Sequence, residues 1–96
     1  MNPVILRTAL EDIERGYAFY ESKELGLGQY FEDSIFSDIA KLEEHAGIHR
    51  QVHGYHRMLA TRFPFAIYYR VEGNEPRIRG ILDCRRAPEW IERKLG

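Results

Sequence analysis

The chain has 96 residues, of which 44% are hydrophobic, 30% are charged and one is a cysteine, and its formal net charge is −1. This composition excludes a disordered chain and an internal disulfide, and the length predicts one globular domain spanning residues 1–96. No apolar run approaches the roughly 20 residues of a membrane-spanning helix, and the N-terminus lacks a signal-peptide pattern, so we expect a cytoplasmic protein with no membrane association.

A short strand over residues 4–7 comes first in the predicted order and leads into a helix. Thr8 and Glu11 have the spacing of a capping box, in which each side chain satisfies a free backbone amide. We therefore expect the helix to begin at Thr8. The sequence Leu-Gly-Leu-Gly at residues 25–28 ends this helix, because glycine supplies the turn.

A second helix is predicted from Gly28 to Gly47, since apolar side chains recur on one of its faces at helical spacing. These side chains belong to Phe31, Ile35, Ile39 and Leu42. Two helices joined by so short a turn pack as an antiparallel hairpin.

After Gly47 the period of the hydrophobic pattern changes from 3.6 to 2, which predicts strands. We expect these strands at residues 52–60, 65–71 and 77–83, with a turn over 72–76. Pro88 suits the first position of a short terminal helix. The order β-α-α-β-β-β-α indicates an α+β fold, in which a helical hairpin packs on one face of a small, mainly antiparallel sheet.

Strand alternation predicts which side chains lie on each face of this sheet. The face toward the hairpin is expected to contain Phe65, Ile67, Tyr69, Val71, Ile78, Gly80 and Leu82. The opposite face is expected to contain Tyr68, Arg70, Arg77, Arg79, Ile81 and Asp83, with Arg85 beyond it. Residues 1–48 carry four basic and ten acidic side chains, and residues 49–96 carry ten basic and five acidic ones. We therefore expect acidic helices and a basic, aromatic sheet face that stays open for a partner.

Four parts of the sequence have a familiar pattern. They are residues 9–13 with 19–21, residues 25–28 with Phe31, residues 62–69, and residues 81–88 with Trp90. In this order and spacing they resemble the RelE/ParE toxin family, and its ParE-like branch more closely. The resemblance covers nearly the whole chain, from Ile5 to Arg93.

The resemblance implies the toxin of a type II toxin–antitoxin system, with a role in growth inhibition and plasmid stabilisation. Such a toxin forms a hetero-oligomer with a cognate antitoxin, which neutralises it. ParE-like members block DNA gyrase, whereas RelE-like members cut mRNA on the ribosome. A third reading is a binding module that kept the fold and lost the activity.

If the chain cuts RNA, it requires no metal. It does require groups that transfer protons, and it requires cations that stabilise the charge on the phosphate. His56, Arg57, Asp83 and Arg85 are the candidates for these catalytic roles, with His53 nearby. The departures from the RelE-like pattern favour gyrase over mRNA as the target. Trp90 provides no labile proton, and Phe65 and Ala66 stand where ribosome-acting relatives have an arginine.

The candidates for binding a target lie on the second half of the chain. They are Arg57, Tyr68, Arg70, Arg79, Arg85 and Arg86. We expect one residue of the Arg85–Arg86 pair to contact the partner and the other to form a structural ion pair, for instance with Asp83.

Four histidines at residues 45, 49, 53 and 56 are close enough in sequence to suggest zinc, but Gly47 and Gly54 interrupt any shared helix. We expect no metal and no cofactor.

Overall fold

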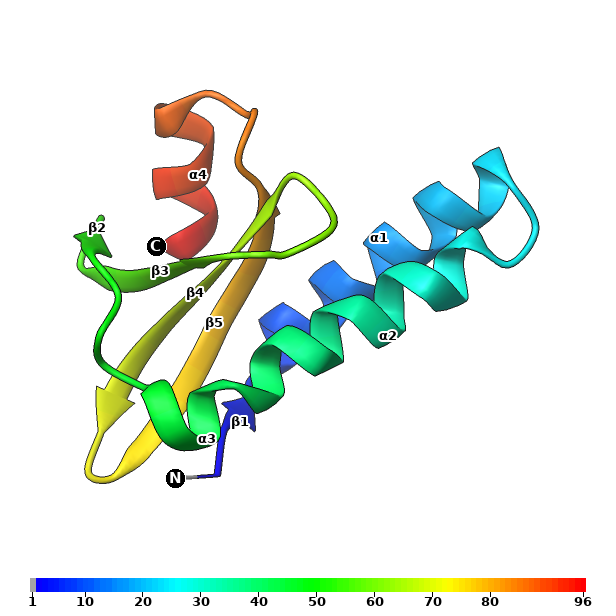
Figure 1. Cartoon of the computed structure of the whole chain (residues 1–96). Coiled ribbons are helices and arrows are strands. Elements are labelled where there is room, and N and C mark those ends of the chain that lie inside the picture. The colour runs from blue at the N-terminus through cyan, green and yellow to red at the C-terminus, as the bar shows by residue number, and fades with distance from the viewer. Residues whose placement is uncertain (1) are drawn as a thin grey trace.

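The computed structural model describes residues 2–96. The helices and strands are β1 (Val4–Ile5), α1 (Arg7–Lys23), α2 (Leu27–Ala40), α3 (Leu42–His45), β2 (Gln51–Val52), β3 (Tyr55–Leu59), β4 (Phe65–Glu72), β5 (Glu75–Asp83) and α4 (Pro88–Leu95). The strands form one sheet in the order β1-β5-β4-β3-β2, in which β1 runs parallel to β5 and the other pairs are antiparallel (Figure 1). The predicted α+β fold with a mainly antiparallel sheet is confirmed. Within residues 2–96, no helix has the length and apolar character needed to cross a bilayer.

The hairpin of α1 and α2 packs tightly and extends beyond the sheet (Figure 1). Gly16 of α1 permits this contact, because a Cβ atom there would overlap the ring of Phe31 on α2. The turn is held by Glu21, whose carboxylate accepts the backbone N–H groups of Gly26 and Gly28, each at 2.9 Å at the nearer oxygen. Glu21 thereby satisfies free amides at the start of α2, although it belongs to the preceding helix.

The predicted capping box at Thr8 is wrong. Helix α1 begins at Arg7, and Leu6 occupies the N-cap position without a side-chain hydrogen bond. The Thr8 hydroxyl instead donates to the backbone carbonyl of Arg79, at 2.7 Å. Strand β1 pairs with β5 only at Arg77 and Ile78, so the next carbonyl of β5 is open to this longer-range bond.

Two predicted elements are each divided in the structure. The strand expected over residues 52–60 is a hairpin of β2 and β3, with positive φ angles at His53 (57°) and Gly54 (81°) between them. The second helix is interrupted at Lys41, where α2 gives way to the short α3. Gly47, with φ of 92°, follows α3 as the predicted stop.

The hydrophobic core lies between the hairpin and one face of the sheet. From the helices it includes Ala9, Ile13, Phe31, Ile35, Ile39 and Leu42, and from the strands Met58, Ile67, Tyr69, Ile78 and Ile81. The register of β4 against β5 shifts between Tyr68 and Tyr69, because Arg79 is an extra residue in β5. This bulge reverses the predicted facing of β5 beyond it: Ile81 faces the hairpin, and Gly80 and Leu82 face the other way.

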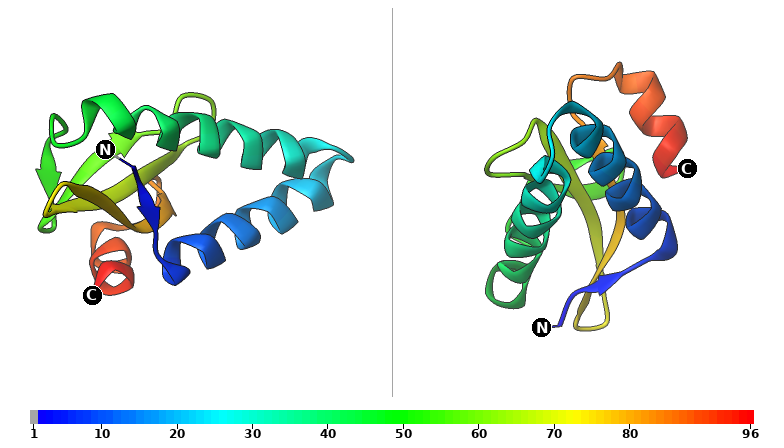
Figure 2. Two further views of the ribbon diagram at one scale, coloured as in Figure 1. Left: turned by 90° about the horizontal axis from the view of Figure 1, so that it is seen from below. Right: turned by 90° about the vertical axis from the view of Figure 1, so that its right-hand side faces the viewer.

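The expected open face of the sheet is covered, so that prediction is wrong. Helix α4 packs there and forms a second core from Tyr55, Ala66, Tyr68, Leu82, Ile91 and Leu95. In the left view of Figure 2, α2 and α4 lie on opposite sides of the sheet. The contact is close at Gly80, where a Cβ atom would lie 3.3 Å from the Leu95 side chain. While α4 is docked, this face of the sheet is accessible only at its margins.

Candidate partner-binding site

The two consecutive arginines after β5 have different environments. Arg85 forms a two-pronged ion pair with Asp83, in which Nε lies 3.0 Å from Oδ1 and Nη2 lies 2.7 Å from Oδ2. The backbone N–H of Arg85 also donates to Oδ1, at 2.9 Å. These hydrogen bonds lower the pKa of Asp83, so the carboxylate stays charged at neutral pH. Arg85 is thus fixed in the turn that leads to α4.

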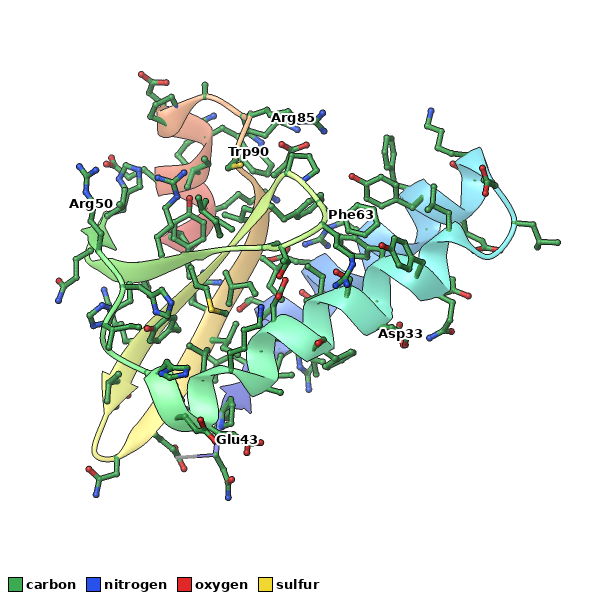
Figure 3. All side chains as sticks on the ribbon, in the orientation of Figure 1. Asp33, Glu43, Arg50, Phe63, Arg85 and Trp90 are labelled. Atoms are coloured by element: carbon green, nitrogen blue, oxygen red, sulfur yellow. The ribbon has the colours of Figure 1, made fainter. Side chains whose placement is uncertain are left out.

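The guanidinium of Arg86 is held by an aromatic ring and has no hydrogen-bonded partner within residues 2–96, whereas its backbone N–H donates to the carbonyl of Asp83, at 3.2 Å. The guanidinium lies 3.9 Å from the ring centroid of Trp90, and the ammonium of Lys94 lies 5.5 Å from the same centroid. Figure 3 shows Arg85 and Trp90 where β5 leads into α4. Trp90 and Lys94 lie four residues apart in α4 and so share one of its faces, whereas Arg86 reaches the same ring from the turn before the helix begins at Pro88. The side-chain donor groups of Arg86 remain free for an external acceptor.

A groove runs along β5 between α1 and α4. Its apolar end has a volume of about 280 Å³ and is lined by Gly16, Phe19, Tyr20, Phe65, Ile81 and Trp90, with Asp83 and Arg86 at the rim. Its polar end has a volume of about 230 Å³ and is lined by Thr8, Glu11, Arg79, Gly80 and Lys94. Asp12, Arg15 and Leu82 line both ends, so the two are continuous.

Asp12 lies in the middle of the groove and connects α1 to β5. Its Oδ2 accepts the backbone N–H of Ile81, at 3.0 Å, and its Oδ1 pairs with Arg15. Burial raises the pKa of Asp12, although the bonds from Ile81 and Arg15 act in the opposite direction. Strand β5 has no neighbouring strand at this point, so Asp12 accepts a backbone N–H that would otherwise be unpaired. This protects the edge of the sheet from pairing with another chain.

Three of the predicted target-binding residues are engaged within the protein. Tyr68 is only 2% exposed and lies under α4, so it is out of a partner's reach while α4 is docked. Arg70 stacks on the ring of Tyr55, at 4.0 Å, and its Nε donates to the carbonyl of Gly54. Arg79 donates to the carbonyl of Lys94, at 3.1 Å, and so ties β5 to the end of α4.

The residues proposed for RNA cleavage do not come together. His56 pairs with Tyr69 in the β3–β4 register, whereas Asp83 pairs with Phe65, so four residues of β4 separate the two positions. That separation is about 13 Å at the usual rise of a strand. His56 stacks on Tyr69 on the hairpin side, at 5.1 Å, while its neighbour Arg57 lies on the face that α4 covers. Arg85 and Asp83 form a pair of their own.

The remaining predicted histidine, His53, lies in the turn between β2 and β3. Its Nδ1 is 3.3 Å from a carboxylate oxygen of Glu92, so it connects this turn to α4. Within residues 2–96, no group of three or more His, Cys, Asp or Glu side chains is arranged to hold a metal ion.

The groove contains residues that the sequence reasoning did not select, notably Asp12, Arg15 and Phe19 of α1. Their contact with β5 spans about 70 positions of the chain, so no local pattern indicates it. The contact of Trp90 with Lys94 could have been found, because the two are four residues apart in the helix that Pro88 predicts. Arg86 precedes that helix, so its position depends on the turn.

Neither a protein-family model nor a curated protein matches this sequence. A chain in the solved structure of the chromosomal ParDE TA system from P. aeruginosa is similar to it in fold, with a TM-score of 0.71. The two are 26% identical, and the match covers 84% of this chain and 92% of that chain.

Proposed function

We propose that this chain, which belongs to the ParE-like branch of the RelE/ParE toxin family, is the toxin of a type II toxin–antitoxin system. A cognate antitoxin neutralises it by forming a hetero-oligomer in the cytoplasm, and its target is DNA gyrase. The similarity to a chain of a ParDE TA system supports the toxin–antitoxin assignment. The separation of the candidate acid–base residues is the observation that favours a protein target over RNA cleavage.

RNA cleavage without a metal needs a base near the ribose hydroxyl and an acid near the leaving oxygen. The surroundings of Arg85 and Arg86 offer poor groups for these roles. Asp83 has a lowered pKa inside an ion pair, and burial raises the pKa of Tyr20 above its ordinary value near 10. His56 lies in β3 opposite Tyr69, about 13 Å along the sheet from the position of Asp83, with its Nδ1 2.6 Å from the carbonyl of His49. Inhibition by binding requires none of these proton transfers.

The groove has the features of a protein-binding surface. Phe19 is 52% exposed beside it, and Trp90 and Arg86 form its opposite wall. Aromatic side chains and arginine are enriched where proteins bind one another, since they combine large contact areas with directed hydrogen bonds. A target that binds here would contact Arg86, rather than the Arg85 that is paired with Asp83.

The test is controlled expression of the chain in bacteria, with and without the protein encoded beside it. We expect growth arrest, rescue by the neighbouring protein, and accumulation of broken chromosomal DNA. Cleaved mRNA with intact DNA would show the RelE-like activity instead. Normal growth with a folded, soluble chain would indicate an inactive binding module and would contradict the toxin assignment.

A further inference from the structure

The cations around the α1–α4 groove differ in whether they form an ion pair within the protein. Arg15 pairs with Asp12, and Arg85 pairs with Asp83. The side chains of Arg86 and Lys94 form no hydrogen bond or ion pair within the described residues. They contact the ring of Trp90, and their charges also act on Asp83 and Asp12, respectively, without forming an ion pair with them. The wall formed by α4 and the turn before it therefore presents two positive charges whose side-chain hydrogen bonds are unused.

These two charges flank an apolar surface. The Trp90 ring lies between Arg86 and Lys94 and faces the same cavity as Phe19, Tyr20 and Phe65. Gly16 of α1 lines the same cavity. A cavity of about 280 Å³ accommodates a bulky apolar side chain, and the cations beside it suit carboxylates.

We infer that the α1–α4 groove is a docking site for an acidic, amphipathic segment of the antitoxin, which inserts a bulky apolar side chain beside Trp90 and pairs its carboxylates with Arg86 and Lys94. This inference rests on the proposed function for the identity of the partner. The chemistry of the segment comes from the groove itself, through charge complementarity on one wall and an apolar cavity at one end.

The acidic groups of the groove favour a peptide over a nucleic acid. Asp12 and Asp83 occupy Arg15 and Arg85 in ion pairs, and Glu11 adds a negative charge, so the groove has few cations left for a chain that carries a phosphate at every nucleotide. A peptide can place its few carboxylates beside Arg86 and Lys94 and leave apolar groups opposite the acids. The stacking of Arg86 on Trp90 also holds the guanidinium in place before binding, which lowers the entropy lost on docking.

Binding can be followed directly, because Trp90 is the only tryptophan of the chain. The titrant is the purified protein encoded by the adjacent reading frame, or a tryptophan-free variant of it if required. We expect the emission of Trp90 to shift to shorter wavelength as the groove is covered. The double variant Arg86→Glu/Lys94→Glu should bind about a hundredfold more weakly, since each of the two lost charge-assisted hydrogen bonds costs about tenfold in affinity.

The matched control is Arg50→Glu/Arg93→Glu, which makes the same change in net charge. Arg93 belongs to α4 but does not line the groove, and Arg50 precedes β2. The control should bind within twofold of the original chain. Phe19→Ala tests the apolar contact without a change of charge and should also weaken binding about tenfold. Circular dichroism and thermal melting establish that each variant is folded.

Equal affinities of the groove variant and the control would overturn the inference. A second result would also overturn it. This is that a 20-nucleotide single-stranded RNA binds the original chain tightly but not the groove variant, whereas the neighbouring protein binds both equally. The titration does not depend on toxicity. If expression of the chain does not arrest growth, the toxin assignment is refuted, but the measured affinities still decide whether this groove is the docking site.

Discussion

The most informative stability test concerns Asp38, a carboxylate that is 2% exposed in α2. Its Oδ2 accepts the backbone N–H of Thr61, at 2.8 Å, and its Oδ1 accepts the Thr61 hydroxyl and the ammonium of Lys41. These bonds fix the β3–β4 loop against the helical hairpin. Burial acts to raise the pKa of Asp38, but the bonds from Thr61 and Lys41 outweigh it and hold the pKa below its ordinary value.

Asp38→Ala removes both bonds to Thr61 and the pair with Lys41. A hydrogen bond to a charged group contributes about 1.5–3 kcal/mol, and Lys41 is exposed enough to regain water, so the expected loss is about 3–5 kcal/mol. That is a large part of the roughly 5–15 kcal/mol that stabilises such a protein, and it corresponds to a Tm lower by about 12–30 °C. Asp33→Ala, at an exposed position of the same helix, should change the free energy of unfolding by less than about 0.5 kcal/mol.

The assay is urea unfolding, followed by Trp90 fluorescence and circular dichroism. Because the folded pKa of Asp38 is lowered, its contribution is present above the unfolded pKa of about 4 and is lost as the pH falls through the folded value. The stability of Asp38→Ala should accordingly depend less on pH in the acid range. A loss below about 1 kcal/mol at pH 7 would refute this account of the β3–β4 loop.

Two further predictions concern the core. Gly16→Ala should lower stability by about 1–2 kcal/mol in a thermal melt, since the overlap with Phe31 outweighs the gain in helix propensity of about 1 kcal/mol; an unchanged or higher Tm would contradict the close packing of the hairpin. The hydroxyl of Tyr69 accepts the N–H of Gly47 and lies 2.5 Å from Nδ1 of His49, and it donates to that nitrogen when the nitrogen is unprotonated. Burial, with two neighbouring histidines, lowers the pKa of His49, so stability should fall as the pH drops below about 6.5. Tyr69→Phe should lower the free energy of unfolding by about 1–2 kcal/mol at pH 8. In thermal melts at pH 6.5 and pH 5, the stability of this variant should fall less with pH than that of the original chain. An equal fall in both proteins would count against this hydrogen bond.

The periodicity of the sequence was sufficient to predict the helices of the hairpin and strands β4 and β5, because their apolar positions repeat with a clear period. It was insufficient to predict on which face of the sheet Ile81 and Leu82 lie. The bulge at Arg79 adds one residue to β5 and exchanges the two faces, and a bulge leaves no local mark when the extra residue is an ordinary one.

The site was predicted in part. The double arginine after β5 is a feature of the sequence, but the pairing of Arg85 with Asp83 and the stacking of Arg86 on Trp90 depend on the turn between them. Helix α4 has an apolar stripe at Ile91 and Leu95, which predicts that it packs against something without indicating what. Its docking on the sheet buries Tyr68 and moves the accessible surface to the groove.

The most direct measurement for the proposed function is DNA supercoiling by purified gyrase in the presence of the purified chain, with ribosomes translating a labelled mRNA as the parallel assay. The proposal predicts that supercoiling falls as the chain is added, that the neighbouring protein restores it, and that the mRNA stays intact. Undiminished supercoiling together with cleavage of the mRNA would contradict it, and would mean that residues as far apart as His56 and Asp83 are not needed together for the chemistry.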